Sequence, residues 1–421
     1  MTRTELRLAD ALDAAARGVR EDTLRPLLVP QRLRRRAAWT APAAAVASLL
    51  LVVGLAAVVA GHLPGSGQLS AAGPPPRYYV EAGYSGFPQV RSTASGAVTD
   101  TVRVPQAGGA LVPYLLTAAS NGVFFAAVNG PPVVRLYRFR LTAVGRVQGL
   151  RPVPGGALGS AQWAADAMAA SPDGSQVAVS LGPRADPGTS ICSSPSGSSC
   201  IGPPSDHSDH IYVVNTASGA RSFWHGGTGQ NLAVSVLSLS WTSKGNELAY
   251  FGQWCPQRSG NPACGARGTR TGGATAEVRA LNPASGGGSL TSGPVLFSLS
   301  EAFPSVAQAV ISPDGSTITA AALTGAGGRL HTPTALTVEQ ISIATRKPLK
   351  VLYRQSLSGA ASINSTPDYA TLIADATGSH WLFSEMNGSL PPGPGNLNGW
   401  IDGGQLMPLQ PANGSVVTEA W

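Results

Sequence analysis

Lysine, cysteine, aromatic residues and charge are all scarce in this chain of 421 residues, of which aromatics make up 6% and charged residues 12%. Lysine occurs only at positions 244, 347 and 350. Glycine and proline are abundant by contrast, with 51 and 34 residues. This composition favours many short strands joined by turns, in a chain long enough for a large core.

Positive charge is also scarce beyond the N-terminal segment. Residues 1–38 hold nine arginines and five acidic residues, which leaves 20 basic and 17 acidic residues for the rest of the chain. A groove that follows nucleic-acid phosphates needs clustered Arg and Lys interleaved with aromatics. We find no such cluster after Arg36, and we therefore expect no nucleic-acid partner.

One long apolar run is present, from Ala37 to Gly61, and no second run of comparable length follows it. Some 20 apolar residues cross a bilayer core of about 30 Å. Basic residues before such a run place that end in the cytoplasm, and here they are Arg32, Arg34, Arg35 and Arg36. The sequence predicts a single transmembrane helix over 38–61 in the cell membrane, with a cytoplasmic head over 1–37. A cleaved signal peptide ending near Val58 and Ala60 is the alternative, although the leader and the apolar run are both long for one.

The segments flanking the span have their own signatures. Thr2 and Glu5 form a capping box ahead of an amphipathic helix, which we expect to lie on the inner leaflet or to contact a cytoplasmic regulator. Residues 62–77 are rich in Pro, Gly and Ser and predict an extended linker. A tail over 413–421 either adds a strand or stays loose.

A hairpin pattern recurs five times after the span, each copy being an apolar run, a polar turn and a second apolar run with strand-like alternation. The copies cover 115–128, 167–181, 237–252, 307–323 and 362–376. Their turns are marked by Asp173-Gly174, Asp314-Gly315 and Asp368, in settings such as Ser-Pro-Asp-Gly. Pro presets the first corner, Asp bonds the backbone beyond it, and Gly takes the positive φ.

A second turn pattern alternates with the first, in forms such as Asn215-Thr216-Ala217-Ser218-Gly219. The first pattern is typical of the inner hairpin of a four-stranded blade, and the second is typical of its outer hairpin. Successive inner turns lie 52, 71, 70 and 54 residues apart. The sequence predicts an all-β propeller of about six four-stranded blades over 78–412. The chain opens with an outer hairpin and closes with an inner one around Gly403-Gly404, so that its two ends share one blade.

The recurring Ser-Pro-Asp-Gly and Asn-x-Ala-Ser-Gly turns resemble those of the WD-repeat-like and TolB-like β-propellers of bacterial envelope proteins, over roughly residues 78–412. The scarcity of lysine and the plentiful alanine are typical of GC-rich, actinobacterial coding. The resemblance implies a propeller with a binding role and identifies no particular partner.

The four cysteines form two short-range pairs, Cys192 with Cys200 and Cys255 with Cys264, in segments rich in Gly and Pro. In an exported domain such pairs predict local disulfides that close inserted loops, over 182–209 and 253–275. Neither pair has the C-x-x-C spacing of a zinc site, so we expect no metal there. Free thiols remain the alternative.

Side chains for catalysis are sparse. Asp206-His207-Ser208-Asp209-His210 is the one dense run of potential metal ligands, but alternate residues of an extended segment point to opposite sides. There is no G-x-S-x-G nucleophile elbow. The remaining carboxylates lie singly beside strands or turns, at Asp166, Asp173, Glu247, Glu277, Asp314 and Glu339. We interpret Trp163, Trp241, Tyr250 and Trp254 as aromatics packed between blades.

We therefore expect a non-catalytic, membrane-anchored propeller without cofactor, which binds a protein, peptide or cell-wall ligand outside the cytoplasm. Loops on a rigid scaffold carry most recognition, and the two cysteine-bearing insertions should project from one face. An envelope hydrolase or lyase that uses carboxylates in the propeller channel is the alternative.

Overall fold

The computed structural model describes residues 74–83, 86–105, 114–130, 132–161, 163–183, 209–226, 232–242, 247–258, 261–262, 275–299, 305–324, 335–356, 369–375, 378–386, 397–402, 405–409 and 416–421. The predicted head, the apolar span and most of the linker lie outside these ranges, as do Asp368, Cys192, Cys200 and Cys264. The contacts divide the chain into Met1–Ala71 and Ala72–Trp421. Of the residues described, none belongs to a helix long and apolar enough to cross a membrane.

Runs of small and β-branched residues pair into six sheets, which confirms the predicted six blades. Counted from the innermost strand outward, blade one is β26 (Val416–Ala420), β1 (Tyr78–Gly83), β2 (Gln89–Ser92) and β3 (Val98–Thr101). Blade two is β4 (Tyr114–Ala118), β5 (Val123–Gly130), β6 (Val133–Leu141) and β7 (Val147–Leu158). Blade three is β8 (Trp163–Ala170), β9 (Gln176–Pro183), β10 (His210–Asn215) and β11 (Arg221–His225).

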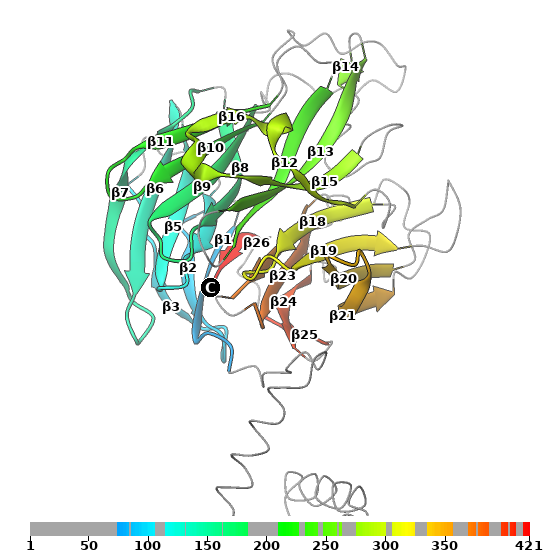
Figure 1. The fold of residues 1–421 in the computed structure, drawn as a ribbon. Helices are drawn as coiled ribbons and strands as arrows, with labels where there is room; N and C mark the ends of the chain where they lie inside the picture. The colour runs from blue at the N-terminus through cyan, green and yellow to red at the C-terminus, as the bar shows by residue number, and fades with distance from the viewer. Residues whose placement is uncertain are drawn as a thin grey trace, which may run out of the picture. The chain divides into compact units, whose positions relative to one another are not determined.

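Blade four is β12 (Leu232–Trp241), β13 (Leu248–Arg258), β15 (Thr275–Leu281) and β17 (Val295–Ser298), with β14 (Asn261–Pro262) paired to β13. Blade five is β18 (Ser305–Ile311), β19 (Thr317–Thr324), β20 (Ala335–Ser342) and β21 (Pro348–Ser356). Blade six is β22 (Tyr369–Ala374), β23 (Trp381–Met386), β24 (Leu397–Asp402) and β25 (Gln405–Pro408). Figure 1 shows the six sheets around a common centre, with β26 in red near β1 in blue.

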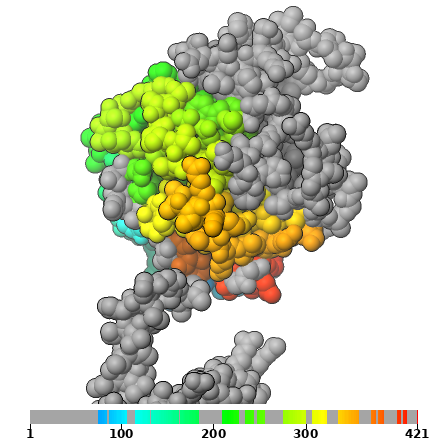
Figure 2. Space-filling model, turned by 45° about the vertical axis from the view of Figure 1, so that its right-hand side comes forward, coloured from blue at the N-terminus to red at the C-terminus, as the bar shows by residue number. Residues whose placement is uncertain are grey.

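The core lies between adjacent blades. Alternating side chains of each sheet pack against the next sheet, as where Phe125, Val179 and Leu181 form one cluster between blades two and three. Trp241, Tyr250 and Trp254 are buried in the cluster between blades three and four, which confirms their predicted packing role. In Figure 2 the yellow-green and orange surfaces of blades four and five lie side by side.

The chain closes in a way that differs from our expectation. The C-terminal tail adds the innermost strand of blade one, so three strands from the start of the propeller pair with one from its end. The expected inner hairpin around Gly403-Gly404 is wrong, because β24 and β25 are the outer strands of blade six.

The inner turn of blade six was also misplaced, because it follows Ala374 and does not precede Tyr369. Asp375 accepts a hydrogen bond from the backbone N–H of Ser379 at 2.9 Å, and Gly378 takes a φ of +71°. These residues perform the roles of Asp and Gly in a Ser-Pro-Asp-Gly turn in a different order. The sequence pattern alone therefore gave the wrong position.

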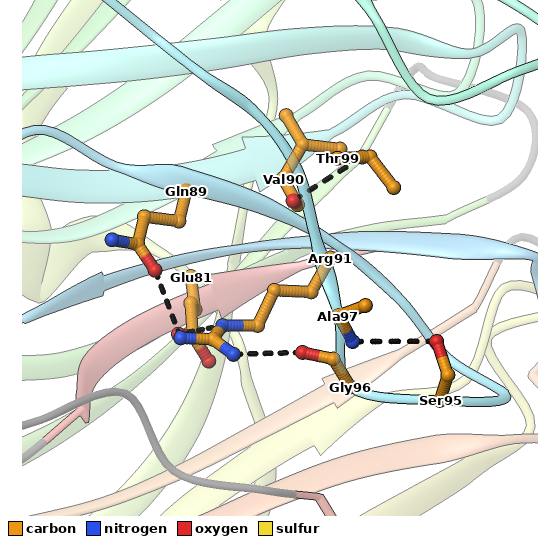
Figure 3. A network of polar contacts seen from close by, with 8 residues as sticks. All are labelled: Glu81, Gln89, Val90, Arg91, Ser95, Gly96, Ala97 and Thr99. Atoms are coloured by element: carbon orange, nitrogen blue, oxygen red, sulfur yellow. Dashed lines mark hydrogen bonds and ion pairs between the residues drawn. The ribbon is translucent and has the colours of Figure 1, made fainter.

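A buried polar network holds the closing blade together (Figure 3). Arg91 of β2 pairs with Glu81 of β1, donates to the carbonyl oxygen of Gly96 at 2.7 Å, and donates to Oε1 of Gln89 at 2.8 Å. Burial raises the pKa of Glu81 even though the charge of Arg91 acts to lower it. The network ties two strands to the turn that joins β2 to β3.

A connection from blade four covers the outer edge of blade three. β16 (Gly287–Ser289), between the 3₁₀ turns η2 (Pro283–Ser285) and η3 (Leu290–Ser292), pairs in parallel with β11. Gly287 has a φ of +132°, and a β-carbon there would stand 2.2 Å from the carbonyl oxygen of Phe223. Glycine is therefore required for this approach, which protects an otherwise open sheet edge.

Candidate recognition face

The alternation of strand direction gives the propeller two unlike ends. Within each blade the turns between first and second strands, and between third and fourth strands, lie at one end, which we call the turn end. Connections between second and third strands, and between blades, lie at the other, the loop end. Thr216, between β10 and β11, accordingly donates its N–H to the carbonyl oxygen of Ser175, between β8 and β9, at 2.8 Å.

At the turn end, Asp173 and Asp314 each stabilise their own turn. The Asp173 carboxylate accepts hydrogen bonds from the Ser171 hydroxyl at 2.7 Å and from the Ser175 N–H at 3.0 Å, which lower its pKa. Burial acts to raise the pKa of Asp314, but the matching bonds from Ser312 and Ser316 outweigh it and lower the pKa. Gly174 and Gly315 take φ values of +68° and +74°.

Neighbouring inner turns touch each other along the turn end. The Asn121 amide donates to the carbonyl oxygen of Asp173 at 2.6 Å, which joins blades two and three. A β-carbon on Gly378 of blade six would stand 3.2 Å from the ring of Pro313 in blade five. These contacts assign the repeat-turn residues to the framework.

Three inner strands share a bulge near the loop end. The register shifts at Asp166 in β8, at Leu237 in β12 and at Ala307 in β18, each five residues before the first residue of the following turn. A polar side chain of the preceding blade binds beside two of these bulges. Asn129 bonds both the N–H and the carbonyl of Ala165 at 2.7 and 3.1 Å, and Asp209 accepts from the Val236 N–H at 2.6 Å.

Asp166 is the one carboxylate among these three bulge residues, and the structure brings it beside Asp209. A β-carbon on Gly182 would stand 2.1 Å from Oδ2 of Asp166 and 2.8 Å from Oδ1 of Asp209, so the two carboxyl groups are neighbours across this glycine. The His210 ring lies 4.4 Å from that of Trp163 at the same end. From the dense run, the structure thus places Asp209 and His210, whereas residues 206–208 lie outside the described ranges.

Two carboxyl groups this close together disfavour the ionisation of both. Asp166 and Asp209 can therefore share one proton or bind a cation between them. A metal centre needs more ligands, and the described residues contain no group of three or more His, Cys, Asp or Glu side chains that could hold an ion. Of the inner strands β4, β8, β12, β18, β22 and β26, as described, two carry a carboxylate, Asp166 and Glu419.

The other singled-out carboxylates lie apart from this pair. Glu277 pairs with Arg279 at 2.8 Å, and the Arg279 guanidinium lies 4.5 Å from the centre of the Trp254 ring. Glu339 is on β20, where burial raises its pKa. Glu247 immediately precedes β13.

The two cysteine-bearing segments begin at the loop end of adjacent blades. The first follows β9 and ends before Asp209, and the second follows β13. The predicted boundary at 253 is wrong, because β13 continues to Arg258 and pairs there with β14 at the upper edge of Figure 1. Cys255 is therefore a strand residue, opposite Ala233 in the register.

Blade two carries a basic cluster that was not predicted. The segment Val133–Leu141 carries Arg135, Arg138 and Arg140, and Arg151 lies directly across from Arg138 on β7. Our statement that no such cluster follows Arg36 is therefore wrong. The signal was visible as arginines interleaved with Tyr137 and Phe139, but only the register shows that Arg151 joins them.

Comparisons with known proteins add little to this geometry. No protein-family model matches the chain, and no curated protein matches it. Among solved structures, the Dos1 propeller has 11% identity and a TM-score of 0.39, covering 79% of this chain and 77% of that one. The Swd1 propeller domain from Myceliophteria thermophila has 10% identity and a TM-score of 0.37, covering 73% and 77%.

A prolyl endopeptidase structure has 15% identity and a TM-score of 0.36, and the chain spans 34% of its length. Scores this low identify no relative. The six-bladed all-β propeller is established by the strand pairing itself.

Proposed function

We propose that this chain is a membrane-anchored propeller whose loop end binds a protein, peptide or cell-wall ligand outside the cytoplasm without catalysis. Its head would contact a regulator on the cytoplasmic side. Rigid sheets that present loops from several blades are a common basis for recognition.

The observation that carries this proposal is the point at which the chain enters the propeller. The carbonyl oxygens of Pro76 and Arg77 accept hydrogen bonds from the Thr93 hydroxyl and N–H, at 2.6 and 2.9 Å. Thr93 begins the turn from β2 to β3, so the entry lies at the turn end. An anchor in the preceding segment would hold the turn end near the bilayer and direct the loop end away from it.

The binding surface is tested by replacing residues 184–208 and 263–274 with short Gly-Ser linkers. We expect the full-length variant to keep its urea midpoint and to lose the partner that wild type captures by crosslinking in native membranes. A matched control shortens residues 325–334, the equivalent connection of blade five, and should retain that partner. Partner capture by the doubly shortened protein would refute the assignment.

The anchor is tested with a reporter that is active only outside the cytoplasm. We expect activity when the reporter follows Trp421 and none when it precedes Arg32. The opposite pattern would exclude the anchor, and release of a soluble ectodomain would favour the signal peptide.

The hydrolase or lyase alternative would have to use Asp166 and Asp209, the described carboxylates that meet. We expect no turnover in an activity screen on wall glycans and esters. Turnover that is lost in Asp166→Asn and kept in Asp402→Asn would establish the enzyme instead.

A further inference from the structure

Three positively charged arginines lie close together on the outer hairpin of blade two. Arg138 of β6 lies directly opposite Arg151 of β7, and Arg140 follows two residues along β6. Like charges directly opposite each other destabilise an antiparallel pair. The hairpin therefore carries a destabilising charge repulsion between Arg138 and Arg151.

No acidic side chain offsets this charge within the described ranges, where the ion pairs join Arg91 to Glu81, Arg279 to Glu277 and His380 to Asp375. Nε of Arg138 is buried and has no hydrogen-bond partner. Burial, with the charges of Arg151 and Arg140, lowers the pKa of Arg138. Three positive charges without a counter-charge repel one another, so the cluster is suited to an external anion.

The tip of the same hairpin packs against the point where the chain enters the propeller. The Thr99 hydroxyl donates to the carbonyl oxygen of Gly145 at 2.8 Å, and the Val147 N–H donates to Asp100 at the same distance. A β-carbon on Gly145 would stand 2.6 Å from the ring of Tyr78, the first residue of β1. The arginine-bearing hairpin thus reaches the turn end beside the entering segment.

We propose that Arg138, Arg140 and Arg151 bind phosphate groups of anionic lipids, so that blade two rests on the surface of the bilayer. This role rests on the anchor of the proposed function, which would bring the turn end to that surface. The guanidinium fork matches phosphate oxygens in geometry and charge. Basic groups near an anionic leaflet bind it in proportion to their number.

The propeller fragment, residues 72–421, is suited to the test because it forms one unit and contains every described strand, including β26 and β1, which close the ring. Its binding is measured by flotation with vesicles of phosphatidylglycerol and phosphatidylcholine, and with phosphatidylcholine alone. We expect binding only to the anionic vesicles, with strong weakening at high salt. Changing all three arginines to glutamine should weaken it about a hundredfold.

The control carries the same change in charge at Arg103, Lys350 and Arg354, which are exposed and lie outside blade two, and should bind like wild type. Equal loss in both variants, equal binding by all proteins, or no binding by wild type would overturn the proposal. Millimolar glycerol phosphate that abolishes binding would also overturn it, since an isolated phosphate site would then replace a membrane surface. Because the reporter fusions test the anchor separately, failure of one proposal is distinguishable from failure of the other.

Discussion

At the turn end of the propeller, short turns touch their neighbours in adjacent blades, whereas at the loop end the strands of blades three and four lead into long connections. Each inner turn at the turn end is specified by local chemistry: a carboxylate accepts from the residues around it, and a glycine takes positive φ. The loop end near Asp166 depends on contacts between residues distant in sequence, such as Asp209 with Val236.

This difference separates framework from recognition. Changes at the turn end should reduce the stability of the ring, and changes in the long connections should leave stability intact and alter binding.

The largest effect is expected from deleting residues 416–421, which form the innermost strand of blade one. The deletion exposes the edge of β1 and removes Trp421, which packs with Tyr79, Leu382 and Leu409. Loss of a buried Trp alone costs about 3–5 kcal/mol, so we expect no cooperative unfolding transition in urea. The linker replacing 184–208 is a longer deletion at the loop end and should leave the midpoint unchanged. A truncated protein with the wild-type midpoint would contradict this.

Gly155 of β7 should be the next most sensitive position. A β-carbon there would stand 2.3 Å from the carbonyl oxygen of Gly219, where blades two and three meet. Gly149, on the same strand, has nearly the same φ, +64° against +63°, and nothing within 4 Å.

We expect Gly149→Ala to cost about 1 kcal/mol from backbone strain, and Gly155→Ala to cost about 2 kcal/mol more because backbone must move. Urea unfolding of the two variants measures the difference directly. Equal losses of stability in the two variants would contradict this, because they would mean that blades two and three can move apart at Gly155 without cost.

Asp173→Asn should have a smaller effect that depends on pH. Because hydrogen bonds lower the pKa of Asp173 in the folded protein, its charge contributes stability above the ordinary Asp pKa of about 3.9, and this is lost as pH falls through the folded pKa. We expect the variant to be about 1 kcal/mol less stable than wild type at pH 7, and we expect this difference to shrink as the pH falls. Asp402→Asn, on an exposed strand end, is the control and should show no such trend. A pH-independent difference would assign the loss to geometry alone.

The smallest effect on stability is expected from reducing the disulfides predicted between Cys192 and Cys200 and between Cys255 and Cys264. Each would close a loop of about ten residues and constrain only that loop, so we expect the Tm to change by less than about 2 °C while partner binding weakens. Peptide mapping without reductant tests the pairing. A link from Cys192 to Cys255 or Cys264, or four free thiols, would contradict it.

Much of the framework could be predicted because its information is local. Ser171 to Gly174 and Ser312 to Gly315 specify their own turns, and inner turns mark five of the six blades, since β26 and β1 of blade one are not consecutive in the chain. The prediction failed at Asp375 to Gly378, where an equivalent turn uses other residues. It failed at the closure because the alternation of hairpins does not show whether one or two strands return to blade one.

The candidate site was less predictable. Asp166 and Asp209 were noticed singly, but their meeting depends on Gly182 and on a bulge that alternation does not reveal. The pairing of Arg138 with Arg151 depends likewise on a register with two irregularities. Contacts of this kind arise from the tertiary fold and leave no signal in neighbouring residues.

Closure by the last strand also sets an order of events during synthesis. β1 is made near the start of the propeller and its partner β26 near the end, more than three hundred residues later. At ordinary rates of about 5–20 residues per second, β1 waits tens of seconds with one edge unpaired. The nascent chain is thus open to mispairing throughout that interval, and the emergence of β26 is the event that completes the ring.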